Sequence, residues 1–172
     1  MKKISMLILS AGLAVSTVHA QAPDPDTTAR HFLIMASIGN LQEINSGGLA
    51  AQKATMPAVK SFGNEMVKDH GDAEAKLLQL AKTKGIQLPA AATDKPPMDL
   101  NLEKAKGQDF DRLYIHNMVP GHASTVSMFQ NYAVTGKDPD VRAFAQQMLP
   151  VIKHHLEMIK AIDEQYKNLA AK

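Results

Sequence analysis

Residues 141–166 read VRAFAQQMLPVIKHHLEMIKAIDEQY and carry the clearest folding signal in the chain. The large apolar residues recur at steps of three, four or seven, the spacing that places side chains on one face of an α-helix. Asp138 and Pro139 precede the stretch and are typical of a helix start. The pattern predicts a long amphipathic helix over residues 139–169. Its apolar stripe consists of Val141, Phe144, Met148, Ile152, Ile159, Ile162 and Tyr166.

Three earlier segments show the same period, at about residues 26–54, 57–84 and 109–135. Pro57 is suited to a helix start, Gly85 and Gly136 are suited to helix ends, and residues 89–99 have the composition of a linker. No segment shows the two-residue alternation of a β-strand. Residues 21–172 are therefore predicted to form one all-α domain, an up-down four-helix bundle.

The first 20 residues have the three parts of a secretion signal. A short positive start, MKK, is followed by an apolar run over residues 4–18 and by a cleavage site that ends at Ala20. The apolar run is shorter than the roughly 20 residues that a membrane-spanning helix needs. We therefore expect residues 1–20 to be a signal peptide, and the mature chain to be periplasmic without a transmembrane anchor.

The charge balance argues against a nucleic-acid partner. The whole chain holds 19 Lys and Arg against 17 Asp and Glu, and the predicted signal peptide contains two of the lysines and no acid. The mature chain is therefore close to neutral, and no basic surface for nucleic acid or anionic lipid is expected. The chain also has no cysteine, which excludes disulfides, thiolate metal sites and cysteine nucleophiles.

Polar residues interrupt the apolar stripe of each predicted helix. His70, His122 and His155 each follow an apolar stripe residue by three or four positions, so each is expected to face inward. Glu43 falls on the matching face of the first helix. One inward ligand from each of four helices is how bundles build metal sites. These four residues are therefore predicted to bind a metal. The alternative is a metal-free network of buried polar side chains.

The residue types restrict the metal. A di-iron carboxylate bundle uses Glu-x-x-His on two helices, and this sequence contains no Glu-x-x-His. Imidazoles with a carboxylate suit zinc or copper(II), whereas thioethers suit copper(I). Met66 and Met118 each lie one turn before a predicted histidine ligand and are candidate soft ligands, although methionine also commonly fills hydrophobic cores. Copper or zinc is therefore expected before iron.

The order of several short stretches resembles a known family. They are GNLQE at 39–43, MVKDH at 66–70, GIQLP at 85–89, FDRLY at 110–114, MVPGH at 118–122, DP at 138–139 and MLP at 148–150. Together they resemble the exported bacterial family called domain of unknown function 4142, over nearly all of the mature chain. The resemblance implies a ferritin-like four-helix bundle and carries over Glu43, His70, His122 and His155. It implies no activity, since fold does not determine function.

Three functions are consistent with these residues. The first is a periplasmic bundle that binds a transition metal for buffering or stress protection, without catalysis. The second is a metal-free structural or interaction module of the cell envelope, with a protein partner that the sequence does not identify. The third and least supported is an oxidoreductase with a dinuclear centre. The other candidate residues are expected at the surface or at helix starts: His31, His116, His154, Asp69, Asp109 and Asp111.

Overall fold

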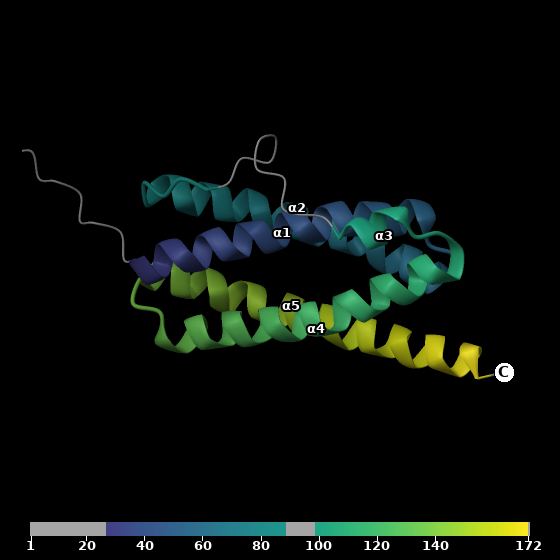
Figure 1. The fold of residues 1–172 in the computed structure, drawn as a ribbon. Coiled ribbons are helices and arrows are strands. Elements are labelled where there is room, and N and C mark those ends of the chain that lie inside the picture. Colours follow the sequence, from purple (N-terminus) through teal and green to yellow (C-terminus); the bar gives the residue numbers. More distant parts are fainter. Residues whose placement is uncertain (1–26, 89–98, 172) are drawn as a thin grey trace, which may run out of the picture.

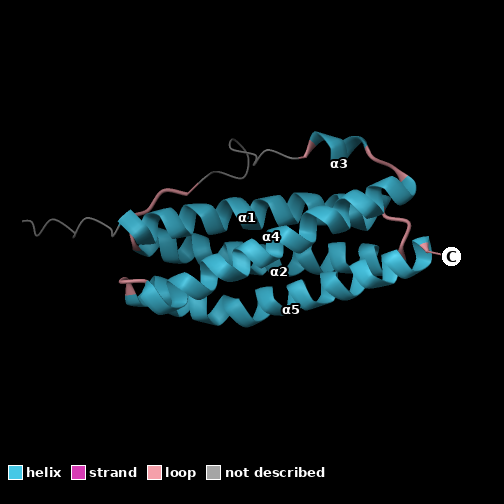
Figure 2. Ribbon diagram, turned by 60° about the horizontal axis from the view of Figure 1, so that its bottom comes forward, coloured by secondary structure: helices cyan, strands magenta, loops and turns pink. Residues whose placement is uncertain are grey.

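The computed structural model describes residues 27–88 and 99–171, and all regular structure in that part is helical. Four long helices lie side by side, with one short helix on the outside (Figures 1 and 2). The all-α class is confirmed, and the observed helix ends lie close to those expected. The predicted signal peptide and nearly all of the predicted linker lie outside the described residues. The helices are α1 (Thr27–Lys53), α2 (Pro57–Thr83), α3 (Leu100–Lys104), α4 (Gly107–Thr135) and α5 (Pro139–Ala170).

The long helices do not alternate in direction as an up-down bundle would. Phe32 near the start of α1 stacks on Tyr132 near the end of α4, so these helices run in opposite directions. Phe62 and Tyr114, in the first halves of α2 and α4, meet edge to face, so these helices run in the same direction. The end of α2 therefore lies at the opposite end of the bundle from the start of α4 (Figure 1). One long crossover is typical of ferritin-like bundles, and the expected up-down order is corrected at this step.

A carboxylate from α4 caps the start of α2. Met56, which precedes Pro57, makes no side-chain cap of its own. Asp111 accepts hydrogen bonds from the backbone N–H groups of Thr55 (3.0 Å) and Met56 (2.9 Å), and from the Thr55 hydroxyl. Asp111 is fully buried. The expectation of a helix-start acid therefore holds for Asp109, in the first turn of α4, and is corrected for Asp111.

The backbones of α1 and α2 meet at a pair of glycines. A Cβ atom on Gly63 would lie 2.7 Å from the Gly47 carbonyl oxygen and 2.7 Å from the Ala50 Cβ. A Cβ atom on Gly47 would lie 2.7 Å from the Gly63 carbonyl oxygen. Only residues without a side chain permit this approach.

We expect Gly63→Ala to destabilise the fold by about 1–3 kcal/mol, the usual cost of overpacking. The matched control is Gly71→Ala on the same helix, where a Cβ atom would meet nothing within 4 Å. Alanine should stabilise α2 there by about 0.5–1 kcal/mol, because glycine is the poorer helix residue. Urea unfolding gives both free energies. Equal effects of the two substitutions would contradict the close contact between the helices.

Two hydrophobic clusters fill the bundle, one toward each end. The first contains Phe32, Phe129 and Phe144, and the second contains Phe62 and Tyr114. Between the clusters, all four long helices place polar side chains on their inner faces. The expected apolar stripes are thus interrupted at the same height on every helix. We call this set the polar belt: Ser37, Asn40, Glu43, His70, Glu74, His122 and His155.

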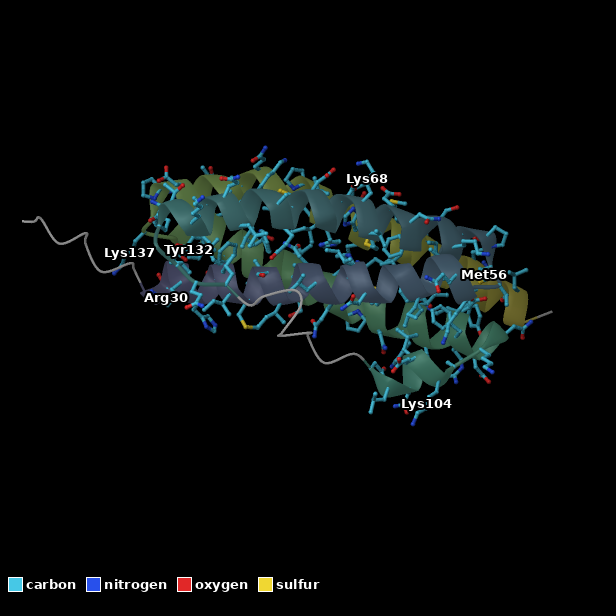
Figure 3. All side chains as sticks on the ribbon, turned by 90° about the horizontal axis from the view of Figure 1, so that it is seen from above. Arg30, Met56, Lys68, Lys104, Tyr132 and Lys137 are labelled. Atoms are coloured by element: carbon cyan, nitrogen blue, oxygen red, sulfur yellow. The ribbon has the colours of Figure 1, made fainter. Side chains whose placement is uncertain are left out.

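The outside of the bundle carries charged side chains and a few large apolar ones, among them Leu100 and Val134, which are 63% and 77% exposed. Lys68, Lys104 and Lys137 are exposed and extend away from the helices (Figure 3). Within residues 27–88 and 99–171, no helix has the length and apolar character that crossing a membrane requires. The features that suggest chemistry therefore lie inside the bundle, in the polar belt.

Candidate metal centre

Three histidine side chains from three helices meet in the polar belt. His70 comes from α2, His122 from α4 and His155 from α5, with exposed fractions of 6%, 2% and 1%. Their ring centroids lie 6.1, 5.4 and 5.7 Å apart, and one ring nitrogen of each lies within 4.8 Å of one from each other ring. The structure thus brings together three of the four residues predicted to form the site. We call them the three-histidine cluster.

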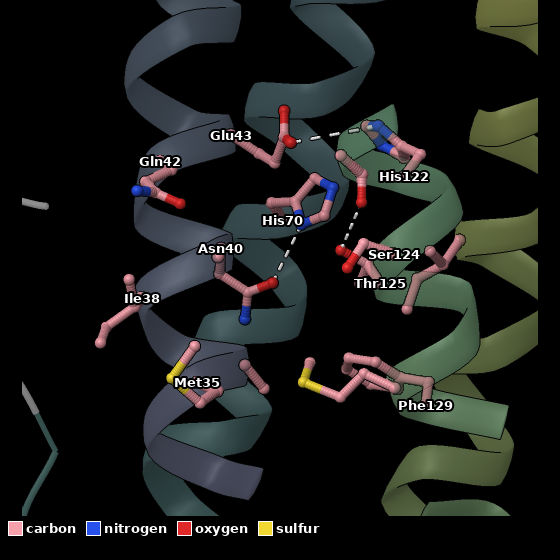
Figure 4. A pocket seen from close by; sticks show the side chains of 15 residues that line it. Met35, Ile38, Asn40, Gln42, Glu43, His70, His122, Ser124, Thr125 and Phe129 are labelled. Carbon is pink, nitrogen blue, oxygen red and sulfur yellow. Dashed lines mark hydrogen bonds and ion pairs between the residues drawn. The ribbon is translucent and has the colours of Figure 1, made fainter. Parts of the chain in front are cut away.

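A chain of hydrogen bonds ties His70 to α1. His70 Nδ1 lies 2.9 Å from Asn40 Oδ1 (Figure 4). The Asn40 side-chain nitrogen donates to Glu74 Oε2 (3.0 Å), and the Ser37 hydroxyl donates to Glu74 Oε1 (2.6 Å). Because the Asn40 nitrogen is engaged by a carboxylate, the Asn40 oxygen faces His70 and can only accept. The network therefore assigns the His70 proton to Nδ1.

His122 and His155 are oriented by different acceptors. His122 Nδ1 donates to the Met118 carbonyl oxygen one turn earlier (3.1 Å), and His155 Nε2 donates to Asp69 Oδ2 (3.1 Å). Burial would raise the pKa of Asp69, but its hydrogen bonds with Lys68 and His155 outweigh this and lower it. The interpretation of Asp69 as a helix-surface residue is therefore corrected. Its side chain is 23% exposed and orients a buried ring.

The other nitrogen of each ring is buried and has no partner. Among the described residues, His70 Nε2, His122 Nε2 and His155 Nδ1 make no hydrogen bond. Leaving such an atom unsatisfied costs about 1–3 kcal/mol. Since the opposite nitrogen of each ring carries the proton, each of these atoms offers a free lone pair. Outer hydrogen bonds of this kind orient histidines that bind metals, so the donor set fits one transition-metal ion held by three imidazoles.

Burial keeps the three rings in the neutral form that binds metals. The pKa of His70 is lowered to about 3, mainly by desolvation and also by the nearby rings of His155 and His122. Desolvation lowers the pKa of His122 to about 4, against the opposing hydrogen bond to Met118. It also lowers the pKa of His155, although Asp69 opposes the shift. At neutral pH the unpartnered nitrogens are therefore unprotonated.

The sequence matches one known domain family over most of its length. Domain of unknown function (DUF4142) matches residues 14–162. The chain belongs to the DUF4142 family. This confirms the family that the sequence resembles. No curated protein matches this DUF4142 chain.

Several solved structures share the fold of this DUF4142 protein. CopM in its Cu(I)-bound form is 22% identical with a TM-score of 0.67, and the match covers 82% of this chain and 96% of CopM. A DUF305 fragment from Deinococcus radiodurans is 11% identical with a TM-score of 0.69, covering 81% and 97%. The conserved hypothetical protein Rv2844 from Mycobacterium tuberculosis is 14% identical with a TM-score of 0.64, covering 81% and 99%. At these identities, the matches show a shared helical fold.

Glu43 lies beside the three-histidine cluster. Its Oε1 is 4.0 Å from His122 Nδ1, the nitrogen that already bonds to Met118 (Figure 4). Within the described part of the chain, the buried Glu43 Oε2 has no hydrogen-bond partner. Burial raises the pKa of Glu43 to about 7, against the opposing hydrogen bond with Ser46. Glu43 and a neutral His122 therefore do not form a full ion pair at pH 7. That Glu43 binds the metal stays a prediction.

The two predicted thioether ligands lie in the hydrophobic core. Met66 is fully buried and Met118 is nearly so, and both belong to the cluster that contains Phe62. Met118 also supplies the carbonyl oxygen that orients His122. Thioether ligation by either methionine stays a prediction. In the part of the chain that the structure describes, the histidines outside the three-histidine cluster are exposed, as expected, and these are His31, His116 and His154.

Three residues that orient His70 through a chain of hydrogen bonds were not predicted as part of the site, Ser37, Asn40 and Glu74. Asn40 lies four positions after Ala36, a buried apolar residue of α1, and Glu74 lies four positions after His70. Asn40 and Glu74 become candidates when every polar residue on the inward faces is considered, and not only the residue types that bind metals. Asp69 has no such signal, because it lies beside the stripe of its helix.

The metal-free protein is expected to lose stability as the pH falls from about 6.5 toward 4. The unfolded chain takes up protons on His70 and His122 near pH 6.5, whereas the folded chain resists this down to about pH 4 and below. Each such histidine contributes a slope of up to about 1.4 kcal/mol per pH unit. Glu43 acts in the opposite direction between about pH 4.5 and 7, because its pKa is raised in the folded state, and it offsets one histidine.

Urea unfolding at a series of pH values measures this slope. We expect a net loss of about 2 kcal/mol between pH 6.5 and 5. His116→Ala, which changes an exposed ring outside the cluster, should leave the slope unaltered. A free energy of unfolding that is constant over this range would show that the three rings do not resist protonation in the folded state.

Proposed function

We propose that this protein is exported to the periplasm and binds one copper ion at the three-histidine cluster, serving in copper buffering or protection. Two observations carry the proposal: one ring nitrogen of each histidine lies within 4.8 Å of one from each other ring, and each ring has a buried nitrogen that lacks a partner among the described residues. Each ring is oriented by an acceptor on its far side, as in metal sites. A metal-free polar network would need water or another donor at each of these three acceptors.

Copper is favoured over zinc and iron by two observations. The chain lacks Glu-x-x-His, and its cluster offers imidazoles rather than the several carboxylates that di-iron bundles use. Among solved structures of the same fold, CopM is found in Cu(I)-, Cu(II)- and silver-bound forms. Imidazole suits both copper oxidation states, and affinity for divalent ions rises to copper and falls again at zinc.

Export is proposed from the first 20 residues, which have the pattern of a signal peptide. Mass spectrometry of the protein recovered from the periplasm tests this directly. A mature chain that begins at Gln21 is expected. A chain that retains Met1 and stays in the cytoplasm would contradict export.

Metal titration of the mature protein, purified without a His-tag, tests the copper proposal. Copper(I), copper(II), zinc and iron(II) are titrated separately against competing chelators. We expect one tightly bound copper per chain, with zinc weaker and iron(II) weaker still. Binding no tighter than that of surface histidines for any metal would leave the cluster as a polar network and favour an interaction module.

A further inference from the structure

The three-histidine cluster is open to one side of the bundle. A cavity of about 280 Å³ lies between α1 and α4, and Glu43, His70 and His122 help to line it (Figure 4). On the side of α2 and α5, the space beside Asp69 and His155 is about 10 Å³. That space barely admits one water molecule, which needs about 10–15 Å³. Of these two spaces, the cavity between α1 and α4 is therefore the one through which an ion can reach the cluster without displacing a helix.

Glycines on both walls leave this cavity open. Gly39 of α1 and Gly121 of α4 line it, and a Cβ atom on either would meet nothing within 4 Å. Glycine is a poor residue inside a helix, costing about 0.5–1 kcal/mol relative to alanine. Side chains of ordinary size at these positions would extend into the open space. Larger residues could be accommodated at both positions, yet the sequence has glycine at each, and the cavity therefore stays open.

The lining of the cavity is suited to a soft ion. It contains no Lys or Arg, and Glu43 is its single carboxylate. Two methionines line it, Met35 on α1, which is 41% exposed, and Met128 on α4, which is partly buried. Figure 4 shows Met35 on the α1 wall, with Phe129 on the opposite α4 wall. Thioether ligands select copper(I) over harder divalent ions.

We infer that copper(I) enters and leaves the three-histidine cluster through this cavity, with the thioethers of Met35 and Met128 as transient ligands. The inference rests on the proposed copper site and assigns its access route. It gives Met35 and Met128 a role distinct from that of the buried Met66 and Met118. Gly39 and Gly121 are the residues that keep the route open. The transfer exchanges a sulfur ligand for imidazole nitrogen, and the oxidation state of copper does not change.

Filling the cavity tests the route. Gly39→Leu and Gly121→Leu fill it from opposite walls, and leucine is also the better helix residue. Gly48→Leu is the matched control, because it lies on α1, meets nothing within 4 Å at Cβ and does not line the cavity. Circular dichroism confirms folding. Copper(I) is supplied from a bicinchoninate complex and removed with bathocuproine disulfonate, and both rates are followed by absorbance under anaerobic conditions.

Gly39→Leu and Gly121→Leu should each load and release copper(I) at least about 10-fold more slowly than the wild type. Each should still bind one copper at the end point. Gly48→Leu should exchange copper(I) at the wild-type rate. Wild-type rates in both filling variants, with the cluster still loaded, would overturn the route and leave the copper site intact. A wild-type protein that takes up no copper would overturn the proposed function itself, so the two failures are distinguishable.

Methionine replacement tests the thioethers separately. The Met35→Leu/Met128→Leu variant keeps the apolar volume of the lining and removes both sulfur atoms. Copper(I) loading should slow several-fold, while zinc loading keeps its wild-type rate. Equal slowing of both metals, or of neither, would overturn the role of the thioethers.

Discussion

His155→Leu is expected to lower the affinity for copper by at least about 100-fold, since loss of even an outer hydrogen-bond partner costs about 10–100-fold. His154→Leu, one residue earlier, should leave the affinity unchanged. His155 is 1% exposed and belongs to the three-histidine cluster, whereas His154 is exposed. The pair changes the same residue type on the same helix turn and differs in which way the ring points. Competition against a copper chelator measures both affinities.

Folding of the two variants is compared before metal is added. Leucine at position 155 removes a donor to Asp69, whose side chain is 23% exposed and can turn to solvent. The metal-free fold should therefore persist, so a lost affinity reports on the site itself. If the two variants bind copper equally well, the metal is bound outside the three-histidine cluster.

Asp111→Ala should lower the free energy of unfolding by about 2–4 kcal/mol, because the substitution leaves buried hydrogen-bond donors without their carboxylate acceptor. Those donors are the backbone N–H groups of Thr55 and Met56 and the hydroxyl of Thr55. The corresponding fall in melting temperature is about 5–15 °C for a domain of this size. Thermal and urea unfolding of the metal-free protein measure it.

Asp109→Ala is the matched control for this substitution. Asp109 lies two positions earlier, is exposed, and makes one ion pair with Arg112 at 3.5 Å. Exposed pairs of this kind contribute at most about 1 kcal/mol. A loss at Asp111 no larger than that at Asp109 would mean that the cap on α2 is not a stabilising contact.

The sequence predicted the parts of the site that follow from helical periodicity. Ile152, His155 and Ile159 share one face of any regular helix, so the inward direction of His155 follows from spacing alone. The same reasoning placed His70 and His122 inside the bundle. For the three histidines to meet, the apolar faces of the helices must also carry their polar residues at the same height along the bundle. The bundle meets this condition because the two hydrophobic clusters lie on either side of the polar belt.

Partners on other helices could not be predicted in the same way. Asp69 and His155 are 86 positions apart, and Asp111 lies 56 positions from Thr55, so each contact depends on the relative height and rotation of two helices. Periodicity also does not give helix direction, which is why the crossover between α2 and α4 was missed.

X-ray absorption at the copper edge, on the mature protein loaded with one copper, tests whether the three-histidine cluster binds the ion. We expect scattering from three imidazole nitrogens at about 2.0 Å, the usual length of a metal–histidine bond. We also expect the loss of one imidazole contribution in His155→Leu. A copper shell dominated by oxygen, or an imidazole count that His155→Leu leaves unchanged, would contradict a copper site at the three-histidine cluster.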